Sequence, residues 1–347
     1  MSMRSSFMAG VTVLLLLGVP GCKKEAAPAA GEKTGSVTGS GSGSGAKIRI
    51  AVVPKGTTHE FWKSVHAGAA KAAGEEKVEI IWKGPLKEDD LKAQIDVVES
   101  FTAEKVSGIV LAPLSDKGLV TPVKRAKEAK IPVVVFDSDL QGDEHVSFVA
   151  TDNYAAGKMA GEHMVKLLGG KGNVILLRYQ EGSASTSNRE KGFADALKDQ
   201  KDIKVVSDNR YGGATTESAF TTSENLLGAQ KAAAGGVNGV FTPNESTTVG
   251  MLLALRKTNL AGKIKLVGFD SSDKLTEGVK AGHIDALVLQ DPFRIGYLSV
   301  QTMAKHLRGE PIEKRVDTGA KLVTKDNLES PEMKELLHPD LEKWLGK

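Results

Sequence analysis

IPVVVFDS, residues 131–138, and IKLVGFDS, residues 264–271, are the two stretches that decide the fold. Both are apolar runs rich in β-branched residues, which is typical of a strand buried on both faces of a parallel sheet. Both end in Phe-Asp-Ser, and both follow a shorter apolar run and a helical segment. The repeat predicts two similar units, each with a carboxylate at the end of a strand.

The alternation of apolar runs and amphipathic segments extends along the chain from Lys47. It predicts strands at Ile48–Val53, Val78–Trp82, Gly108–Ala112, Pro132–Phe136, Val174–Leu177, Ile203–Val206, Gly239–Phe241, Ile264–Val267 and Ile284–Leu289. Strands that alternate with helices form parallel sheets with helices on both faces. We therefore expect an α/β protein with two similar lobes, each built on such a sheet.

The strand-end carboxylates indicate where a ligand would bind. In open parallel sheets, ligands bind at the carboxyl ends of the strands. Asp137 and Asp270 would then face one cleft between the two lobes. The alternative interpretation is that each is a helix N-cap, a position that also favours Asp and Ser.

Composition excludes several classes of protein. The 347 residues include one cysteine, and the formal net charge is only +3. One cysteine excludes a disulfide framework, a cysteine-based zinc site and an iron–sulfur cluster, and the balanced charge argues against nucleic-acid binding. The sequence contains no phosphate loop, dinucleotide fingerprint or nucleophile elbow, and its seven histidines form no tight ligand pair. We expect no enzymatic activity, no cofactor and no metal.

The N-terminal residues have the pattern of an export signal. Arg4 precedes an uncharged stretch, Phe7–Gly21, that is shorter than the roughly 20 apolar residues needed to span a bilayer. We expect residues 1–21 to be a signal peptide whose end resembles a bacterial lipobox, with Cys22 as the acylated residue. The alternative is an ordinary signal with a chance cysteine. Residues 22–45 are rich in Gly and Ser and predict a flexible tether.

From Lys47 to about Val323 the chain resembles the ribose/galactose-type periplasmic sugar-binding proteins, the solute receptors of ABC importers. Several motifs carry the resemblance in the family's order: His59-Glu60-Phe61-Trp62, Phe136-Asp137-Ser138, Ala150–Gly157, Ser185–Phe193, Asn244 in FTPNE, Asp270 in VGFD and Gln290 in VLQDP. The resemblance implies the type I periplasmic binding fold, with two lobes joined by a multi-strand hinge.

The resemblance also implies a ligand-binding site. Its expected residues are His59, Phe61, Trp62, Asp137, Ser138, Arg189, Asn244, Asp270 and Gln290. These residue types suit a sugar, since aromatic rings cover C–H faces while carboxylates, amides and a guanidinium pair with hydroxyls. Because Phe61 and Trp62 are consecutive, one of them could instead belong to the core. Arg189 could instead form a surface ion pair with Glu190 or Asp195.

Three positions depart from the family's pattern and argue against ribose itself as the ligand. His59 stands where Asn is usual, Ser138 where an arginine is common, and Ala112 where some ribose-type sites have Asn. Hydroxyl selectivity depends on which buried polar groups find partners, at about 1–3 kcal/mol each. The sequence thus indicates a neutral sugar without specifying which one.

By the resemblance, lobe one comprises residues 46–151 and 291–320, and lobe two comprises 152–290 and 321–347. Hinge strands are expected near Thr151, Asp291 and Gly319. The last residues, from Lys325, run past the usual family end and are expected to pack as an extra helix that begins near Pro331.

The function implied is that of a lipid-anchored receptor in the periplasm or on the outer face of the cell membrane. It would capture a neutral sugar by hinge closure, as a monomer, and deliver it to the membrane subunits of an ABC permease. A receptor for a membrane sensor or chemotaxis protein is the alternative, and an enzyme with an unrecognised site is a more distant one. The signal sequence and the lack of an N-terminal helix-turn-helix argue against a DNA-binding repressor.

Overall fold

The computed structural model describes residues 47–346. The expected signal peptide, the tether and the lipidation site Cys22 lie outside these residues. Within the described part of the chain, no helix is both long enough and apolar enough to cross a membrane.

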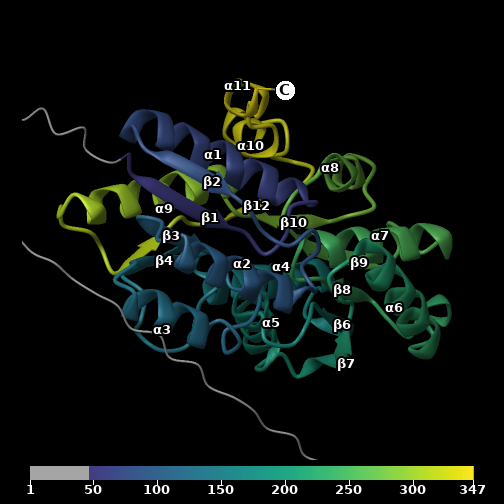
Figure 1. The fold of residues 1–347 in the computed structure, drawn as a ribbon. Coiled ribbons are helices and arrows are strands. Elements are labelled where there is room, and N and C mark those ends of the chain that lie inside the picture. The colour runs from purple at the N-terminus through teal and green to yellow at the C-terminus, as the bar shows by residue number, and fades with distance from the viewer. Residues whose placement is uncertain (1–46, 347) are drawn as a thin grey trace, which may run out of the picture. The chain divides into compact units, whose positions relative to one another are not determined.

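Lobe one is built on a six-stranded sheet. Its strands are β1 (Arg49–Val53), β2 (Glu79–Trp82), β3 (Gly108–Leu111), β4 (Val133–Phe136), β5 (Ser147–Ala150) and β11 (Arg315–Asp317). They lie in the order β11-β5-β4-β3-β1-β2, and all pairings are parallel. Its helices are α1 (Glu60–Glu76), α2 (Leu91–Ala103), α3 (Val120–Glu128) and α9 (Pro292–Leu307). One face packs against α1 and α9 and the other against α2 and α3 (Figure 1).

Lobe two repeats this arrangement. Its strands are β6 (Lys171–Arg178), β7 (Asp202–Tyr211), β8 (Gly239–Phe241), β9 (Lys265–Phe269), β10 (Ala286–Leu289) and β12 (Lys321–Val323). They lie in the order β12-β10-β9-β8-β6-β7, and β12 pairs antiparallel to β10. Its helices are α4 (Asn153–Leu168), α5 (Ala184–Leu197), α6 (Thr216–Ala229), α7 (Glu245–Lys257) and α8 (Asp273–Lys280), with a 3-10 turn at Ala232–Ala234.

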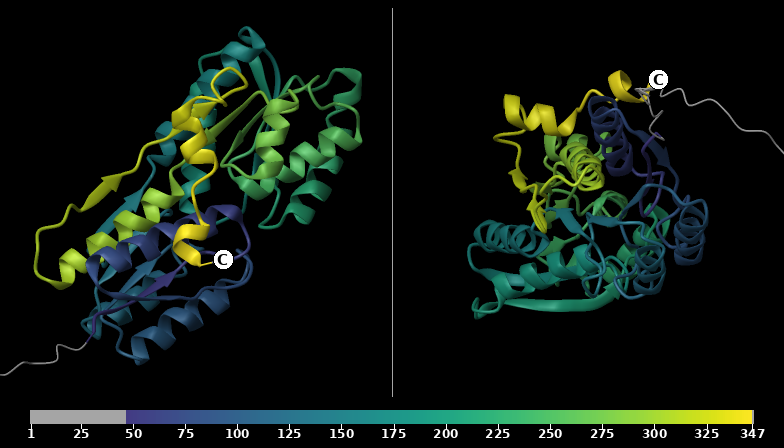
Figure 2. Two further views of the ribbon diagram at one scale, coloured as in Figure 1. Left: turned by 90° about the horizontal axis from the view of Figure 1, so that it is seen from above. Right: turned by 60° about the vertical axis from the view of Figure 1, so that its left-hand side comes forward.

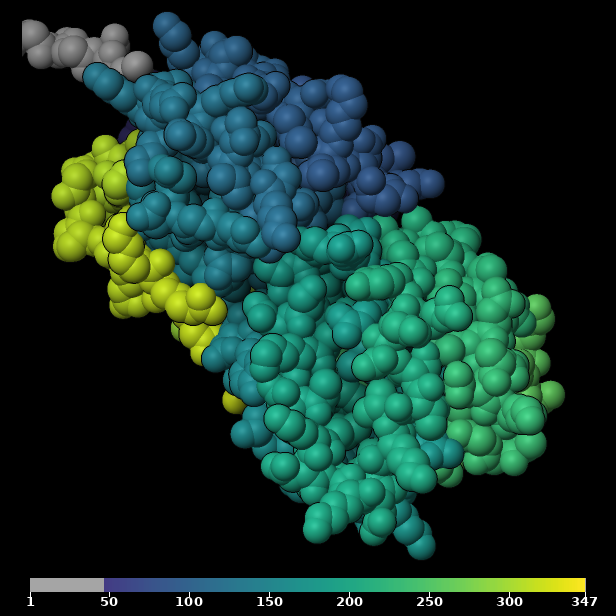
Figure 3. All heavy atoms as spheres, turned by 90° about the horizontal axis from the view of Figure 1, so that it is seen from below, coloured from purple at the N-terminus to yellow at the C-terminus, as the bar shows by residue number. Residues whose placement is uncertain are grey.

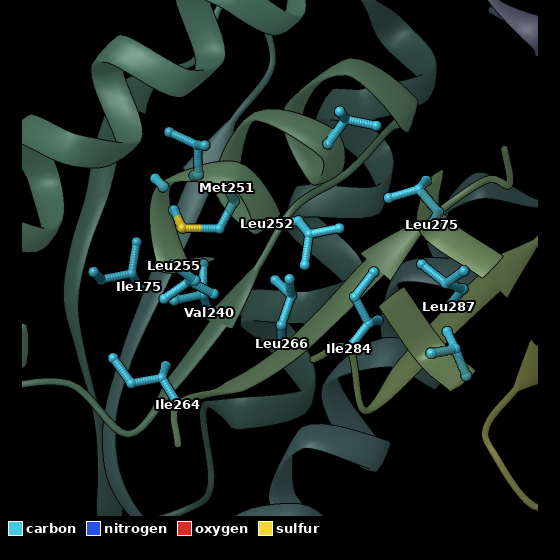
Figure 4. Close-up of a cluster of buried hydrophobic side chains, with 14 of the residues drawn as sticks. Ile175, Val240, Met251, Leu252, Leu255, Ile264, Leu266, Leu275, Ile284 and Leu287 are labelled. Atoms are coloured by element: carbon cyan, nitrogen blue, oxygen red, sulfur yellow. The ribbon is translucent and has the colours of Figure 1, made fainter. Parts of the chain in front are cut away.

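The core of each lobe follows the alternation of side chains along its buried strands. In lobe two, Val240, Leu266 and Leu287 point to one face, where they pack against side chains of α7 and α8 (Figure 4). The opposite face packs against α4 and α5. The prediction of an α/β protein with two similar sheets is confirmed. Each of the nine predicted strands overlaps one of β1–β4 or β6–β10, whereas β5, β11 and β12 were not predicted.

The chain passes between the lobes three times in the described residues. The crossovers are Thr151–Asp152, Gln290–Asp291 and Thr318–Ala320, each of which joins an element of one sheet to an element of the other lobe. The first and third crossovers are hydrogen-bonded to each other, since Thr151 Oγ1 donates to the Gly319 carbonyl oxygen at 3.1 Å. The lobes are in contact along the boundary between them (Figure 3).

The C-terminal segment contacts both lobes. Its helices are α10 (Pro331–Leu337) and α11 (Glu342–Leu345). Met333 of α10 is buried in the lobe-two core, whereas α11 packs against α1 of lobe one. The Nζ of Lys71 on α1 lies 5.8 Å from the centre of the Trp344 ring. Residues 331–345 thus form a strap between lobes (Figure 2), although the sequence grouped them with lobe two alone.

Candidate ligand-binding site

Side chains from both lobes gather around one small cavity between the carboxyl ends of the two sheets. The cavity has a volume of about 30 Å³. It is lined by Lys55, His59, Phe61, Trp62, Glu88 and Asp137 from lobe one and by Tyr179, Ser185, Thr186, Arg189, Asn244, Glu245, Asp270 and Gln290 from lobe two. All the expected site residues except Ser138 line it. Ser138 is fully buried behind it, and its Oγ accepts a hydrogen bond from the Ser185 backbone N–H at 3.1 Å.

Asp137 and Asp270 hold equivalent places at the ends of β4 and β9. Both have left-handed backbone conformations, with φ of 60° and 65°. Non-glycine residues adopt this conformation uncommonly, and such strain concentrates at functional sites. Neither residue caps a helix, because the N-cap of α8 is Ser272 and that of α4 is Asp152. The helix-cap interpretation of these two carboxylates is therefore wrong.

The two carboxylates have different partners. The Oδ2 of Asp137 lies 3.1 Å from the Nζ of Lys55. Asp270 accepts hydrogen bonds from the Gln290 Nε2 at 2.8 Å and from the Glu245 backbone N–H at 3.0 Å. Its Oδ2 also lies 4.0 Å from the Arg189 guanidinium. Burial raises the pKa of Asp270, and the charge of Arg189 opposes that shift.

Arg189 is buried and held within lobe two. Its Nε donates to Asn153 Oδ1 at 2.7 Å and its Nη1 to the Pro243 carbonyl at 2.9 Å, while the guanidinium lies 4.0 Å from the centre of the Phe269 ring. The expected alternative, an ion pair with Glu190 or Asp195, is wrong. Glu190 pairs with Arg178, and Asp195 pairs with Lys191.

The backbone of Arg189 is fixed by close packing of two helices. A Cβ atom on Gly157 of α4 would lie 2.0 Å from the Arg189 carbonyl oxygen, which no side chain could tolerate. Because Gly157 has no side chain, α4 packs closely against α5, and this packing fixes the position of Arg189 relative to the sheet.

Two buried polar atoms of the site have no hydrogen-bond partner among the described residues. They are Nη2 of Arg189, a donor, and Oε1 of Gln290, an acceptor. Because buried polar groups nearly always have partners, such atoms call for one. A ligand that both accepts and donates hydrogen bonds would satisfy them.

Phe61 and Trp62 form the aromatic side of the site. Their rings meet edge to face, with centroids 4.9 Å apart. The expectation that one of them belongs to the core is too simple, because both line the cavity and both pack in the apolar cluster of lobe one. Trp62 is fixed further by its Nε1–H, which donates to Glu88 Oε1 at 2.5 Å.

Glu88 is a functional candidate that the sequence reasoning missed. It lies in the loop after β2 and is buried, and its carboxylate accepts hydrogen bonds from Trp62, from His59 at 2.9 Å and from the Tyr179 hydroxyl of lobe two. Burial opposes charge on both members of the His59–Glu88 pair. Their mutual hydrogen bond and attraction outweigh it and shift the pKa of His59 to about 9 and that of Glu88 to about 2.

Lys55, Glu245, Tyr179, Ser185 and Thr186 were also missed. For Lys55 the signal was available, because it follows β1 as Asp137 follows β4. Glu245 adjoins the predicted Asn244, whose side chain caps α7 by accepting from the Thr247 backbone N–H. Burial raises the pKa of the Glu245 carboxyl to about 7, and this carboxyl accepts from the Phe61 backbone N–H of lobe one.

Direct hydrogen bonds close the cleft around the cavity. Gln180 Nε2 donates to the Glu88 carbonyl at 3.0 Å, and the Asp116 backbone N–H donates to the Gly182 carbonyl at 2.9 Å. With the Ser185–Ser138 and Phe61–Glu245 bonds, these contacts describe a closed pair of lobes.

The side chains of the site are suited to bind a polar molecule that has a flat apolar face. It offers flat rings, carboxylates, an arginine and amides in a closed cleft. Among residues 47–346, no group of three His, Cys, Asp or Glu side chains is placed to hold a metal ion.

Fold and site together define a two-lobed solute-binding protein. The family model for the periplasmic binding protein domain matches residues 50–311. The chain therefore belongs to the periplasmic binding protein family, among its ribose/galactose-type members.

Several characterised proteins are similar over most of their length. The D-ribose/D-allose-binding protein of Pseudomonas aeruginosa is 30% identical, over 80% of this chain and 89% of its own. An ABC transporter solute-binding protein from Agrobacterium vitis, solved with D-fucose, is 36% identical with a TM-score of 0.79, over 84% of this chain and 100% of its own. A carbohydrate-transporter solute-binding protein from Agrobacterium radiobacter, solved with D-arabinose, is 33% identical with a TM-score of 0.80. The match covers 85% of this chain and 100% of its own.

Proposed function

We propose that this protein is an extracytoplasmic receptor that captures a neutral monosaccharide between its lobes and delivers it to an ABC permease. The observation that carries the proposal is the pair of unpartnered buried atoms, Arg189 Nη2 and Gln290 Oε1. Both residues line the cavity, as do Phe61 and Trp62, and neither atom has a partner among the described residues. A sugar hydroxyl can both accept from the arginine and donate to the amide, while a C–H face of the ring packs on an aromatic side chain.

The charges around the cavity favour a neutral ligand. Lys55, Arg189 and the protonated His59 are matched by the carboxylates of Glu88, Asp137 and Asp270. Glu245, with a pKa of about 7, is the remaining carboxyl group of the lining. An acidic sugar would bring an uncompensated charge into a buried site, which is costly.

Hinge closure is the proposed mechanism. Hydrogen bonds join the two lobes over the cavity, so a monosaccharide would enter it only after the lobes separate. Movement about the crossovers at Thr151–Asp152, Gln290–Asp291 and Thr318–Ala320 would open it. A ligand that touches both lobes stabilises the closed form by its higher affinity for that form.

The location and the anchor belong to the same proposal. The related proteins are periplasmic binding proteins and import receptors, which supports an extracytoplasmic site of action. We propose that Cys22 carries the lipid, and metabolic labelling with a radioactive fatty acid tests this. Label that persists in Cys22→Ser would show that Cys22 is not the lipidated residue.

A thermal-shift screen of residues 46–347 tests the function. The panel holds pentoses, hexoses, deoxysugars and polyols, with each uronic acid beside its neutral parent. At 100 times Kd, a ligand stabilises the folded state by about 2.7 kcal/mol, so a hit gives a clear rise in Tm. At least one neutral sugar should respond more than its acid. A flat response across the panel contradicts the proposal.

A further inference from the structure

Lys55 is a buried lysine in the cleft. It lies two residues beyond the end of β1, and its side chain is only 4% exposed. Lysine is almost never buried to this degree unless it is paired, because burial of an ammonium group is costly. The partners of Lys55 therefore show what it does.

Each N–H of the Lys55 ammonium has an acceptor supplied by the protein. Nζ lies 3.1 Å from Asp137 Oδ2, 3.0 Å from Ser185 Oγ and 3.4 Å from Ser183 Oγ. An ammonium group has three N–H donors, so these contacts leave none for a ligand. Lys55 must act on the ligand through the groups it holds.

The partners of Lys55 lie on both sides of the cleft. Asp137 belongs to lobe one, as Lys55 does, whereas Ser183 and Ser185 lie at the start of α5 in lobe two. Ser138, which follows Asp137, carries no charge, and its Oγ accepts from the Ser185 backbone N–H. The positive charge beside Asp137 is therefore that of Lys55, which lies after the end of β1. The Lys55 ammonium contacts lobe two only when the lobes meet.

We propose that Lys55 is a positioning residue that couples the orientation of the Asp137 carboxylate to lobe closure. It holds Oδ2 of Asp137, which leaves Oδ1 for a ligand hydroxyl, and it completes its own hydrogen bonds with the two serines of lobe two. This inference rests on the proposed sugar-binding function and adds a residue to it.

The coupling predicts that the loss of Lys55 affects the closed complex more than the ligand-free protein. In an open cleft, water solvates Asp137, so Lys55→Met should leave the Tm of the ligand-free protein nearly unchanged. In the closed complex, the same variant leaves Asp137 buried without its counter-charge. Truncating one member of such a pair at an interface acts mainly on koff, and we expect the sugar to dissociate at least about 30-fold faster.

The experiment measures Kd and koff for the sugar found in the screen, by calorimetry and stopped-flow fluorescence. Lys92→Met is the matched control, because Lys92 makes an exposed pair with Asp96 on α2 of the same lobe. The control should bind like the wild type. If Lys55→Met also binds like the wild type, the inference is wrong. If the wild type binds no sugar at all, the proposed function fails instead.

A double-mutant cycle tests the contact across the cleft. Ser185→Ala and Lys55→Met should be less than additive in koff, because each removes the same hydrogen bond. Strictly additive effects would mean that Lys55 acts without lobe two and would overturn the coupling. Should Lys55→Met prove unstable without ligand, Ser185→Ala decides alone, and an unchanged koff for it contradicts the inference.

Discussion

Asp137 and Asp270 are equivalent in sequence, in backbone conformation and in position at a strand end, yet the protein holds them differently. The contacts of Asp270 all come from lobe two: Gln290, the Glu245 backbone and Arg189. Asp137 is paired with Lys55, which itself depends on two serines across the cleft. Under the proposed hinge motion, Asp270 would therefore keep its partners in any state of the cleft, whereas Lys55 would gain the two serines only on closure.

This difference suggests an order of events. A sugar can first engage Asp270 and Arg189 on a lobe that needs no rearrangement. Closure then brings Phe61, Trp62 and Asp137 onto the other side of the ring. Substitutions in lobe two should therefore weaken the first encounter, and substitutions in lobe one should mainly shorten the lifetime of the closed complex.

The largest effect is expected from Asp270→Asn. It removes the carboxylate nearest to the buried Arg189 and places an amide beside the Glu245 backbone N–H. Sugar affinity should fall by about 100-fold or more, because one member of a buried charge pair is lost. Since Asp270 has three partners within its own lobe and Asp137 has one, the Tm of the ligand-free protein should fall too. Calorimetry and thermal unfolding measure both quantities.

Asp137→Asn should have a smaller effect than Asp270→Asn. We expect about 10- to 30-fold weaker binding, seen mostly as faster dissociation, because a buried charge again loses its partner. The Tm without ligand should change less than in Asp270→Asn. An equal fall in Tm for the two variants would contradict the inferred difference between the two lobes.

Tyr179→Phe removes a hydrogen bond across the cleft without altering either carboxylate. Its hydroxyl donates to Glu88, which keeps its bonds to Trp62 and His59. A hydrogen bond to a charged group contributes about 1.5–3 kcal/mol, so koff should rise by about tenfold or more. Gln200→Ala, in the turn after α5, is a control away from the cleft that should leave koff unchanged.

The smallest effect is a pH dependence that Glu245 should cause. Burial raises its pKa from the ordinary value of 4.5 to about 7 in the closed protein. We expect an open cleft to expose Glu245 to water, so closure would take up a proton between these values. A group whose pKa is raised on closure favours the closed form at lower pH, and sugar affinity should decline as pH rises through this window. In the closed protein, with pKa values of about 9 and about 2, His59 is protonated and Glu88 ionised throughout this window. Glu245→Gln should flatten the profile, and an unchanged slope would assign it to another group.

Two of the strands that the sequence did not predict share a physical reason. β11 and β12 are three-residue strands at the sheet edges, and they carry exposed charged residues such as Arg315 and Lys321. β5 is different, because it is buried inside the sheet between β11 and β4, but its sequence, SFVA, begins with a polar residue and follows a polar loop. The predicted strands gave continuous apolar runs, whereas β11 and β12 depend on partners distant in sequence.

The candidate site, too, could be predicted only in part from the sequence. The strand-end rule and the family motifs indicated Asp137, Asp270 and Arg189, which the structure brings together at one cavity. Lys55 and Glu88 have the residue types of solvent-exposed positions, and they are buried because the two lobes meet over them. Burial created by tertiary closure leaves no periodic pattern in the local sequence, so Glu88 could be found only in three dimensions. Lys55 carried one further signal, its place after the end of β1.

The C-terminal strap bears on the direction in which the lobes can part. α10 is anchored in lobe two through Met333, and α11 rests on α1 with no buried side chain of its own. Separation on the side of α1 and α8 would lift α11 away from α1, whereas separation on the side of Tyr179 and Glu88 would break the hydrogen bonds across the cleft there and leave α11 in place. The strap would thus favour opening of the cleft on the side of Tyr179 and Glu88, so that a sugar would enter and leave by that edge.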